Sequence, residues 1–196
     1  KAACAARING QVVDLRTPIT EDCALAILTF DDPEGKKAYW HTTSHILAQA
    51  VQRLYPGAKF AIGPAIDNGF YYDFDLPAPL SSEDLPRIEE EMKKVVKENI
   101  ELTRFELDSS QAMEKMAGQE YKQELIEEHS GNGEKISFYE QNDFCDLCAG
   151  PHLMSTGGVK AIKLTSVTGA YWRGDSSKKM LTRVYGISFP KASQLE

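Results

Sequence analysis

The chain has 196 residues, of which 42% are hydrophobic and 26% charged, proportions that are ordinary for a globular protein with a sizeable core. No apolar run approaches the roughly 18 residues of a membrane span, and residues 1–10 lack a signal-peptide core, so we expect a cytosolic (cytoplasmic) protein without membrane contact. The net charge of −7 argues against a general nucleic-acid-binding protein. Four cysteines, two of them isolated, do not form a disulfide framework.

The first 35 residues predict a short β-rich segment. An Asn-Gly pair predicts a tight hairpin over Ile8 to Val13, and Leu25 to Phe30 predicts a strand closed by a turn over Asp31 to Gly35. Because this is too little for a full domain, we expect residues 1–35 to be part of a domain whose remainder lies upstream.

Lys36 to Tyr55 predicts a single amphipathic helix that carries two histidines. Residues at helical spacing give its expected core stripe: Trp40, Thr43, Leu47, Ala50, Val51 and Leu54. His41 and His45 lie four residues apart, one position round from that stripe, so both imidazoles can reach a common point. Such a pair typically holds a metal ion, a water molecule or a substrate atom.

The remaining elements alternate between helices and strands. The pattern predicts a hairpin over Ala61 to Asp75 that turns at Asn68-Gly69, with Phe70, Tyr72 and Phe74 on one face. Helices are expected over Leu85 to Val96, from an N-cap at Ser109 to Gly118, and over Glu120 to Glu128. Strands are expected over Ile100 to Leu107, Ile136 to Tyr139, Val159 to Leu164, Ala170 to Arg173 and Met180 to Phe189. This order predicts an α+β fold with packed helices and a mostly antiparallel sheet.

A second group of potential ligands lies about a hundred residues after the histidine helix. Cys148 and His152, on a Gly-Pro turn, complete with His41 and His45 a four-ligand set suited to tetrahedral zinc. Neutral imidazoles and a thiol can equally hold a water and a hydroxyl by hydrogen bonds. Cys145 and Cys148 also form a Cys-x2-Cys pair, but the Gly-Pro turn breaks the helix that a redox motif would need.

Lys160 to Arg183 is the basic part of the sequence. It holds six Lys or Arg against Asp175 alone, a local charge of +5 that could meet phosphate or could be a solvated face. No glycine-rich phosphate loop occurs, so nothing predicts ATP binding by this segment.

These motifs closely resemble the editing region of bacterial-type threonyl-tRNA synthetases, in the threonyl/alanyl-tRNA synthetase second additional domain family. Four stretches carry the resemblance: His41 to His45, Ile62 to Asp73, Cys148 to His152 and Gly169 to Asp175. Residues 1–35 resemble half of the ubiquitin-like TGS domain. The resemblance therefore implies a partial β-grasp segment over residues 1–35 and an editing domain over 36–196. It also implies that the aminoacylation domain, which alone would need ATP, is absent from this chain.

The resemblance implies hydrolysis of the ester that joins serine, by mistake, to tRNA(Thr). Threonine and serine differ by one methyl group, worth only about 1–3 kcal/mol in a pocket, so a second site that destroys the wrong product is needed. The implied partners are the serine-charged acceptor end of tRNA(Thr), met through Lys160 to Arg183, and the rest of the synthetase. We expect the fragment to be monomeric and the full enzyme a homodimer.

Matching positions to the family assigns two groups of residues. The expected catalytic residues are His41, Lys122, Asp146 and His152. The expected substrate-binding residues are His45, Tyr139, Cys148 and Arg173. His41 and Lys122 would position or deprotonate the water, and Asp146 and His152 would hold the amino group and the ribose.

The resemblance also bears on metal binding. Relatives that edit alanyl-tRNA bind zinc with the same tetrad, whereas the resemblance implies that the threonyl type works without a cofactor. Zinc here would use His41, His45, Cys148 and His152. Ala149 stands where the family often has arginine, which weakens the case for an RNA contact at that turn. The alternatives are a structural zinc module without catalysis, a tRNA-binding appendage with idle residues, and thiol redox chemistry at Cys145 and Cys148.

Overall fold

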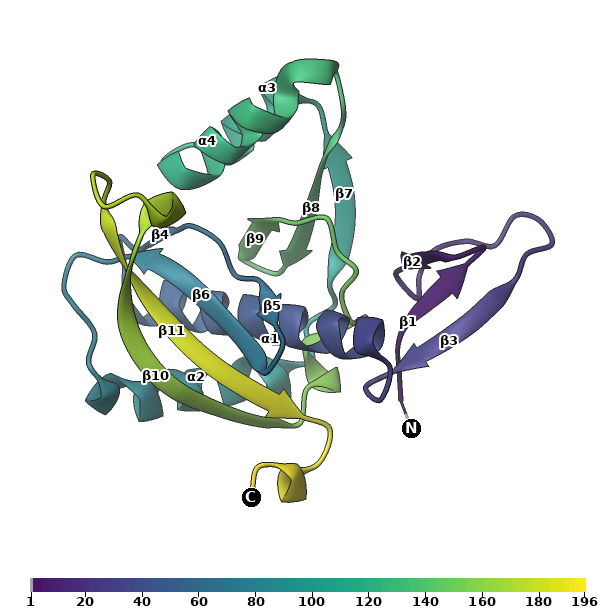
Figure 1. Ribbon diagram of the computed structural model, residues 1–196, viewed down its shortest axis with the longest axis horizontal. Helices are drawn as coiled ribbons and strands as arrows, with labels where there is room; N and C mark the ends of the chain where they lie inside the picture. Colours follow the sequence, from purple (N-terminus) through teal and green to yellow (C-terminus); the bar gives the residue numbers. More distant parts are fainter. Residues whose placement is uncertain (1) are drawn as a thin grey trace.

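The computed structural model describes residues 2–196, so Lys1, the first residue of the expected β-grasp segment, lies outside the described residues. The described residues form four helices and three separate antiparallel sheets (Figure 1). The helices are α1 (Pro33–Leu54), α2 (Leu85–Glu98), α3 (Ser109–Lys115) and α4 (Glu120–His129). The expected α+β class is therefore confirmed.

The N-terminal sheet has the order β2-β1-β3, with β1 (Ala3–Ile8), β2 (Gln11–Val13) and β3 (Leu25–Thr29). The predicted hairpin is confirmed: Asn9 and Gly10 both have positive φ, 49° and 85°, as a tight two-residue hairpin turn requires. The predicted turn over Asp31 to Gly35 is wrong in its second half. Pro33 begins α1, because proline suits the first helical turn, where its missing N–H has no intrahelical acceptor.

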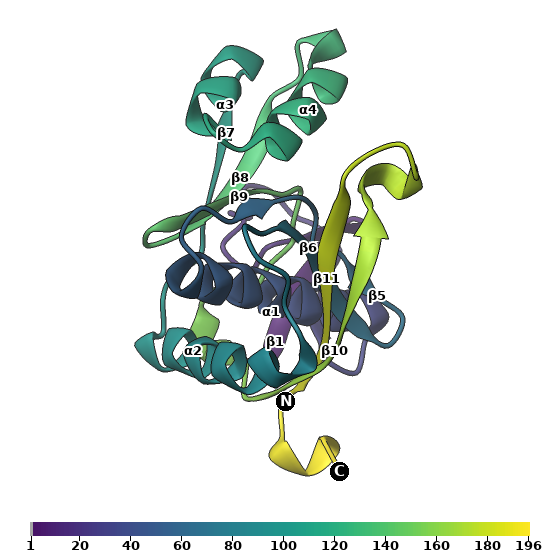
Figure 2. The same cartoon turned by 90° about the vertical axis from the view of Figure 1, so that its left-hand side faces the viewer.

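Helix α1 runs through the middle of the molecule and lies beside α2 on one face of the central sheet (Figures 1 and 2). From Ala38 to Val51 every residue except His41 is buried, so the prediction of an amphipathic helix with one core stripe is wrong. The N-terminal sheet, α2, the central sheet and strand β9 all contact this helix. Tertiary packing from several sides therefore buries even its polar residues. One of them is Thr43, whose hydroxyl forms a hydrogen bond of 2.8 Å with the hydroxyl of Ser188.

The central sheet has the order β10-β11-β6-β4, with β5 paired to β6. Its strands are β4 (Lys59–Phe60), β5 (Ala65–Ile66), β6 (Gly69–Asp75), β10 (Ala161–Tyr171) and β11 (Met180–Phe189). The predicted shared face of Phe70, Tyr72 and Phe74 is confirmed, since all three are fully buried. The two strands predicted from Val159 to Arg173 form one strand instead, because Gly169 stays in register opposite Thr182.

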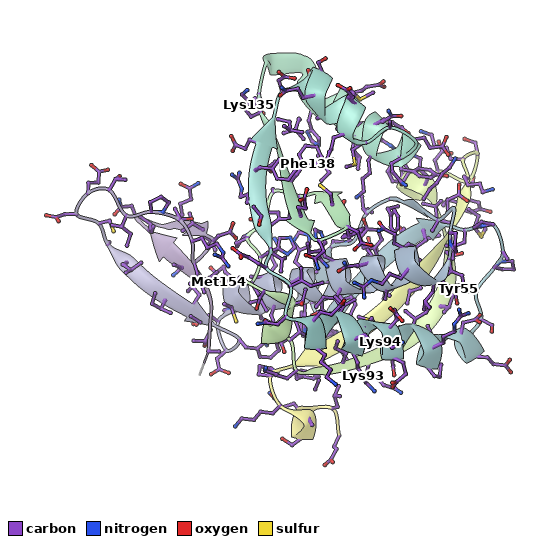
Figure 3. All side chains as sticks on the ribbon, turned by 180° about the vertical axis from the view of Figure 1, so that it is seen from behind. Tyr55, Lys93, Lys94, Lys135, Phe138 and Met154 are labelled. Carbon is purple, nitrogen blue, oxygen red and sulfur yellow. The ribbon has the colours of Figure 1, made fainter. Side chains whose placement is uncertain are left out.

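The third sheet consists of β7 (Thr103–Leu107), β8 (Ile136–Gln141) and β9 (Phe144–Leu147), in that order. Helices α3 and α4 cover its outer face, and Phe138 lies between the sheet and these helices (Figure 3). The N-cap of α3 is Asp108 and not the predicted Ser109: its carboxylate accepts from Gln111 N at 2.8 Å in a capping box.

The inner face of the third sheet looks toward α1, and this arrangement positions the site. The period of two in β9 turns Phe144 and Asp146 toward α1 and Cys145 and Leu147 toward the outer helices. Within residues 2–196, no helix is long and apolar enough to cross a bilayer.

Candidate functional site

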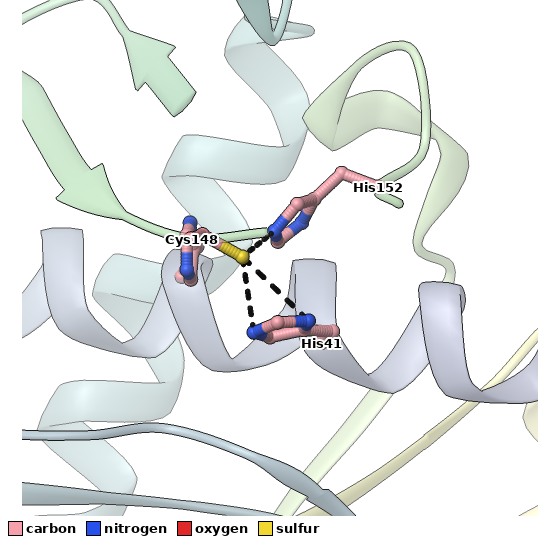
Figure 4. Close-up of side chains that lie close together, drawn as sticks. His41, Cys148 and His152 are labelled. Atoms are coloured by element: carbon pink, nitrogen blue, oxygen red, sulfur yellow. Dashed lines mark hydrogen bonds between the residues drawn. The ribbon is translucent and has the colours of Figure 1, made fainter. Parts of the chain in front are cut away.

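The structure brings His41, His45, Cys148 and His152 together at the middle of α1. One potential ligand atom from each residue lies within 4.8 Å of those from the other three. The histidine pair comes from α1, and Cys148 and His152 come from the loop that follows β9. Figure 4 shows the sulfur of Cys148 between the rings of His41 and His152. The four-residue group predicted from spacing therefore exists as a cluster.

Cys148 is the centre of the cluster. Its Sγ lies 3.0 Å from His152 Nε2 and 3.4 Å from His41 Nε2, and it accepts the backbone N–H of Gly150 at 3.3 Å. Burial raises the pKa of the Cys148 thiol to about 12, so the group carries its proton at neutral pH. The thiol proton is directed to the nearest acceptor, His152 Nε2.

Thr42, which the sequence analysis missed, fixes the tautomer of His152. The Thr42 hydroxyl donates its single proton to the carbonyl of Ala38 at 2.9 Å and accepts from Leu153 N at 2.9 Å. Its contact with His152 Nδ1, at 3.0 Å, must therefore be one in which Nδ1–H donates. Nε2 is left as a bare acceptor that faces Cys148.

Asp146 is a second centre, beside the cluster. Its Oδ1 lies 2.6 Å from Lys122 Nζ, and its Oδ2 accepts from the Tyr72 hydroxyl at 2.6 Å and lies 3.3 Å from His45 Nε2. Lys122 reaches it from the buried face of α4, one turn before the core residue Ile126. Tyr72 was expected only as a packing residue. Nothing in the sequence around it predicts that its hydroxyl bonds to Asp146.

The electrostatics leave neutral rings beside one internal ion pair. Burial, followed by repulsion from His45, lowers the pKa of His41 to about 3, and burial lowers the pKa of His45 to about 4. Burial also holds the pKa of His152 well below its ordinary value. Burial acts to raise the pKa of Asp146, but the Lys122 ammonium, His45 and the hydrogen bonds from Lys122 and Tyr72 together outweigh it and keep that pKa low.

His41 differs from the other two site histidines in its exposure. His45 and His152 expose 2% and 1% of their surface, whereas His41 is partly exposed. The ring nitrogens of His152 are both engaged, and His45 Nε2 faces Asp146. Within the described residues, the ring nitrogens of His41 have polar contacts with the Cys148 sulfur alone, at 3.4 and 3.8 Å. His41 is thus the imidazole that an incoming molecule can reach.

Tyr139 joins the site from β8. Its ring centroid lies 4.3 Å from that of His152, and its hydroxyl donates to Asp14, a residue of the N-terminal segment that the sequence analysis did not select. Seven of the eight predicted site residues are therefore brought together, directly or through Asp146 and His152. Their individual roles stay predictions.

Arg173 is the predicted site residue that the structure does not bring to the cluster. It lies in the β10–β11 connection, where it pairs with Glu124 and Glu128 of α4. Four more basic residues of the Lys160 to Arg183 segment also meet carboxylates, namely Lys163, Lys178, Lys179 and Arg183. The local charge of +5 is therefore largely balanced within the fold.

Cys145 lies on the opposite face of β9 from the cluster, against residues of α3 and α4, and both Cys145 and Cys148 are free thiols. Burial raises the pKa of Cys145 to about 12, as it does for Cys148. Two protonated thiols, one on the outer face of β9 and one in the loop that follows it, do not have the reactive-thiolate environment of a redox pair.

The donor set fits zinc. Three imidazoles and one thiol are the ligand types that zinc takes, and second partners already hold two of the rings: Thr42 for His152 and Asp146 for His45. His45 Nδ1 is buried without a hydrogen-bond partner in the described structure, as a free ligand atom would be. Zinc binding would require Cys148 to lose its proton.

Comparison with known protein families gives a match within this chain. Residues 136–185, from β8 into β11 and including Cys148 and His152, match the family described as the threonyl and alanyl tRNA synthetase second additional domain. This domain therefore supplies the third sheet's central strand, the ligand loop and most of the strand pair β10–β11.

Several threonine–tRNA ligases are similar to the whole of this chain. The threonine–tRNA ligases of Caldanaerobacter subterraneus subsp. tengcongensis and Acetivibrio thermocellus are each 60% identical to this chain, and that of Clostridium tetani is 62% identical, over 198 aligned residues. Each alignment covers 100% of this chain and 31% of the relative. The resemblance inferred from the motifs is confirmed: along its whole length this chain aligns with a region of these threonine–tRNA ligases.

Proposed function

We propose that this chain is the proofreading part of a threonyl-tRNA synthetase, a deacylase that hydrolyses the ester of serine on tRNA(Thr). The observation that carries the proposal is the partly exposed, neutral His41 in a cluster that adjoins the buried Lys122–Asp146 pair through His45. The relatives are named as ligases of threonine to tRNA, and such enzymes need a means of rejecting serine. In this proposal residues 1–35 are a partial TGS-like segment, residues 36–196 are the editing domain, and both act in the cytoplasm.

In this proposal His41 acts on the water molecule that attacks the ester. Because a base with a pKa near 3 takes a proton weakly, His41 orients the water and shares its proton as the transition state forms. The water oxygen bonds to the ester carbon, the bond from that carbon to the ribose oxygen breaks, and the water proton ends on the ribose oxygen. The products are free serine and intact tRNA.

The buried ion pair supplies charge at the reacting group. The Lys122 ammonium, held at 2.6 Å from Asp146, is a positive group that can stabilise the developing oxyanion or hold the water. Asp146 has two oxygens with further acceptor capacity, so it can receive the ammonium of the seryl group in addition to Lys122. His152 and Tyr139 are assigned to the ribose side, and His45 and Cys148 to the wall of the site.

The proposal needs no metal. If zinc is held, His41, His45, Cys148 and His152 hold it, and its chemistry would be that of a Lewis acid which lowers the pKa of water. The specific observation that favours a purely structural zinc module is the closed four-ligand group itself. Such a module would bind zinc stoichiometrically and unfold when a chelator removed it.

The test compares release of labelled amino acid from seryl-tRNA(Thr) and threonyl-tRNA(Thr), with and without a chelator. We expect rapid loss of serine, retention of threonine and no effect of chelation. The variants His41→Ala and Lys122→Ala should each lose deacylation, whereas His129→Ala, which changes an exposed histidine outside the cluster, should not. Full activity in the first two variants would contradict the assignment. Absence of hydrolysis by the folded wild-type chain would favour a binding or structural module.

A further inference from the structure

The N-terminal segment reaches into the candidate site through one side chain. Asp14 directly follows β2, and each of its carboxylate oxygens accepts a hydrogen bond from a different part of the site. Oδ1 accepts the backbone N–H of His152 at 2.8 Å, and Oδ2 accepts the hydroxyl of Tyr139. These partners lie 138 and 125 residues away in the sequence.

We propose that Asp14 is a positioning residue of the editing site, and that through it the N-terminal sheet is a working part of that site. The inference rests on the proposed function for its catalytic consequence. Asp14 touches neither the ester nor the water; it acts through the backbone of His152 and the ring of Tyr139.

The contacts of His152 explain why this position matters. Thr42 fixes its side chain at Nδ1 and also binds Leu153 N, so α1 holds the loop from one side. Asp14 holds the same loop from the other side, at His152 N. With both constraints, His152 Nε2 is kept 3.0 Å from Cys148 Sγ. Without Asp14, the backbone N–H of His152 would lose its acceptor, while the neighbouring N–H of Leu153 would still be held by Thr42.

Tyr139 depends on Asp14 as well. Its ring exposes 3% of its surface and packs against the ring of His152, and its hydroxyl needs an acceptor at that depth. Asp14, Tyr139 and His152 also line a common cavity of about 370 Å³ between the N-terminal segment and the third sheet. Because this cavity can admit water, packing alone does not hold the turn once the carboxylate is removed.

A second contact between the same parts of the chain provides a matched control. Arg16 pairs with Glu101 at 2.8 Å and reaches Met154 O at 3.4 Å, on an exposed surface. It helps to attach the N-terminal segment and lines the same cavity, but within the described residues no hydrogen bond or ion pair joins it to a site residue. If the N-terminal sheet only needs to be attached, loss of Arg16 and loss of Asp14 should have similar effects.

The experiment uses the 196-residue chain with Asp14→Ala, Asp14→Asn and Arg16→Ala, and measures deacylation of seryl-tRNA(Thr). Loss of a charge-assisted acceptor predicts a fall in kcat of about 10- to 100-fold for Asp14→Ala, with KM within about twofold. Asp14→Asn should stay within about fivefold of wild type, since an amide keeps one acceptor for His152 N and offers its N–H to the Tyr139 oxygen. Arg16→Ala should retain wild-type kcat.

A second readout separates this inference from the proposed function. Hydrogen exchange of the His152 amide should accelerate at least about tenfold in Asp14→Ala and stay slow in Asp14→Asn and Arg16→Ala. If the wild-type chain has no deacylase activity, the proposed function fails, and the exchange comparison still tests whether Asp14 holds this turn.

The outcomes that overturn the inference are specific. Unchanged kcat and unchanged exchange in Asp14→Ala would show that Asp14 positions nothing. A rise in KM alone, shared by Arg16→Ala, would show that the segment is merely attached. If Asp14→Ala does not fold, Asp14→Ser, whose side chain is too short for both contacts, takes its place with the same expectations.

Discussion

Lys122 Nζ lies 2.6 Å from Asp146 Oδ1, and the two side chains expose only 4% and 3% of their surface. A buried pair of this kind is held in place by further hydrogen bonds, here from Tyr72, and by the imidazole of His45. The pair therefore joins α4, β9, β6 and α1 at one point. Its loss should affect stability as well as activity.

Lys122→Met tests this relationship. Removal of one partner leaves an uncompensated buried charge, and we expect the free energy of unfolding to fall by about 3–5 kcal/mol in urea titrations. The double variant Lys122→Met with Asp146→Leu should lose less than the sum of the single variants, because it leaves no unpaired charge.

The matched control for that measurement is Lys93→Met. Lys93 pairs with Glu90 at 3.0 Å on the exposed side of α2, where Figure 3 shows it directed outward. Its removal should cost no more than about 1 kcal/mol. Equal losses in the two variants would contradict a special role for the buried pair.

The sequence predicted much of the site because its ligands lie in short local patterns. The spacing of His41 and His45 on a helix and of Cys148 and His152 on a turn indicated the cluster, and the structure assembles it. Many strand and helix positions followed from periodicity and turn residues. The exceptions are the ends of α1 and α3, the start of β7, the unbroken β10, and the strands β4 and β9, which were not predicted. Two of these errors have a clear cause. Pairing with β11 keeps β10 unbroken at Gly169 although glycine indicated a turn, and Asp108 caps α3 in place of the predicted Ser109.

The residues that the sequence analysis missed act over long sequence separations. Thr42, Tyr72 and Asp14 reach partners 110, 74 and 138 residues away, and nothing near them in the sequence distinguishes their side chains from those of ordinary polar residues. The burial of α1 on all sides was likewise not predictable, because it depends on three sheets and α2 packing round one helix. Local sequence patterns therefore predicted the potential metal ligands but not the residues that hold the site in place by hydrogen bonds.

Thr42→Val tests how His152 is held. Valine keeps the shape but removes the acceptor of both His152 Nδ1–H and Leu153 N–H, so we expect a loss of about 1–3 kcal/mol in stability. Deacylation should fall by roughly 10- to 100-fold, because the fixed Nδ1–H tautomer is lost. ¹⁵N spectra of labelled histidine should show a single tautomer in the wild type and a mixture in the variant.

Thr42→Ser is the control for the hydroxyl. Serine retains the donor and the acceptor at this position, so tautomer and activity should stay near those of the wild type. A mixture of tautomers already present in the wild type would contradict the hydrogen-bond assignment.

Acid should destabilise the fold over a defined range of pH. The pKa of His41 is lowered to about 3 and that of His45 to about 4, and that of His152 is also low. Between pH 6.5 and about 4 the unfolded chain binds protons at these rings and the folded chain does not. The free energy of unfolding should therefore fall with falling pH, by about 1.4 kcal/mol per pH unit for each histidine.

Urea unfolding at pH 7, 6 and 5 measures how steeply the free energy of unfolding depends on pH. The variant His152→Gln should reduce this dependence by the contribution of one histidine. The low pKa of Asp146 adds a further loss only below its ordinary value of 3.8. Stability that rose on acidification between pH 6.5 and 5 would show that the rings are charged in the folded chain.

Arg173 is expected to act in tRNA binding and not in chemistry. It lies on the surface beside Glu124 and Glu128, apart from the cluster. If it exchanges these carboxylates for phosphate, Arg173→Ala should raise KM for seryl-tRNA(Thr) and reduce the salt slope of binding by about 1, with kcat unchanged. Lys94→Ala, on the outer side of α2, should change neither quantity. A fall in kcat at constant KM would place Arg173 in the reaction itself.

Metal binding by the tetrad can be tested with cobalt, whose visible spectrum reports thiolate and imidazole ligands. Because the Cys148 thiol has a pKa of about 12 in the free site, a metal ion must displace its proton, so the apparent affinity should rise about tenfold per pH unit. Cys148→Ser should abolish the thiolate band, and Cys145→Ser should leave it intact, since Cys145 lies on the other face of β9. Loss of the band in Cys145→Ser alone would mean that the metal takes a different set of ligands. If cobalt binds tightly but chelation leaves both folding and serine release unchanged, the tetrad is a site that tolerates metal and does not need it.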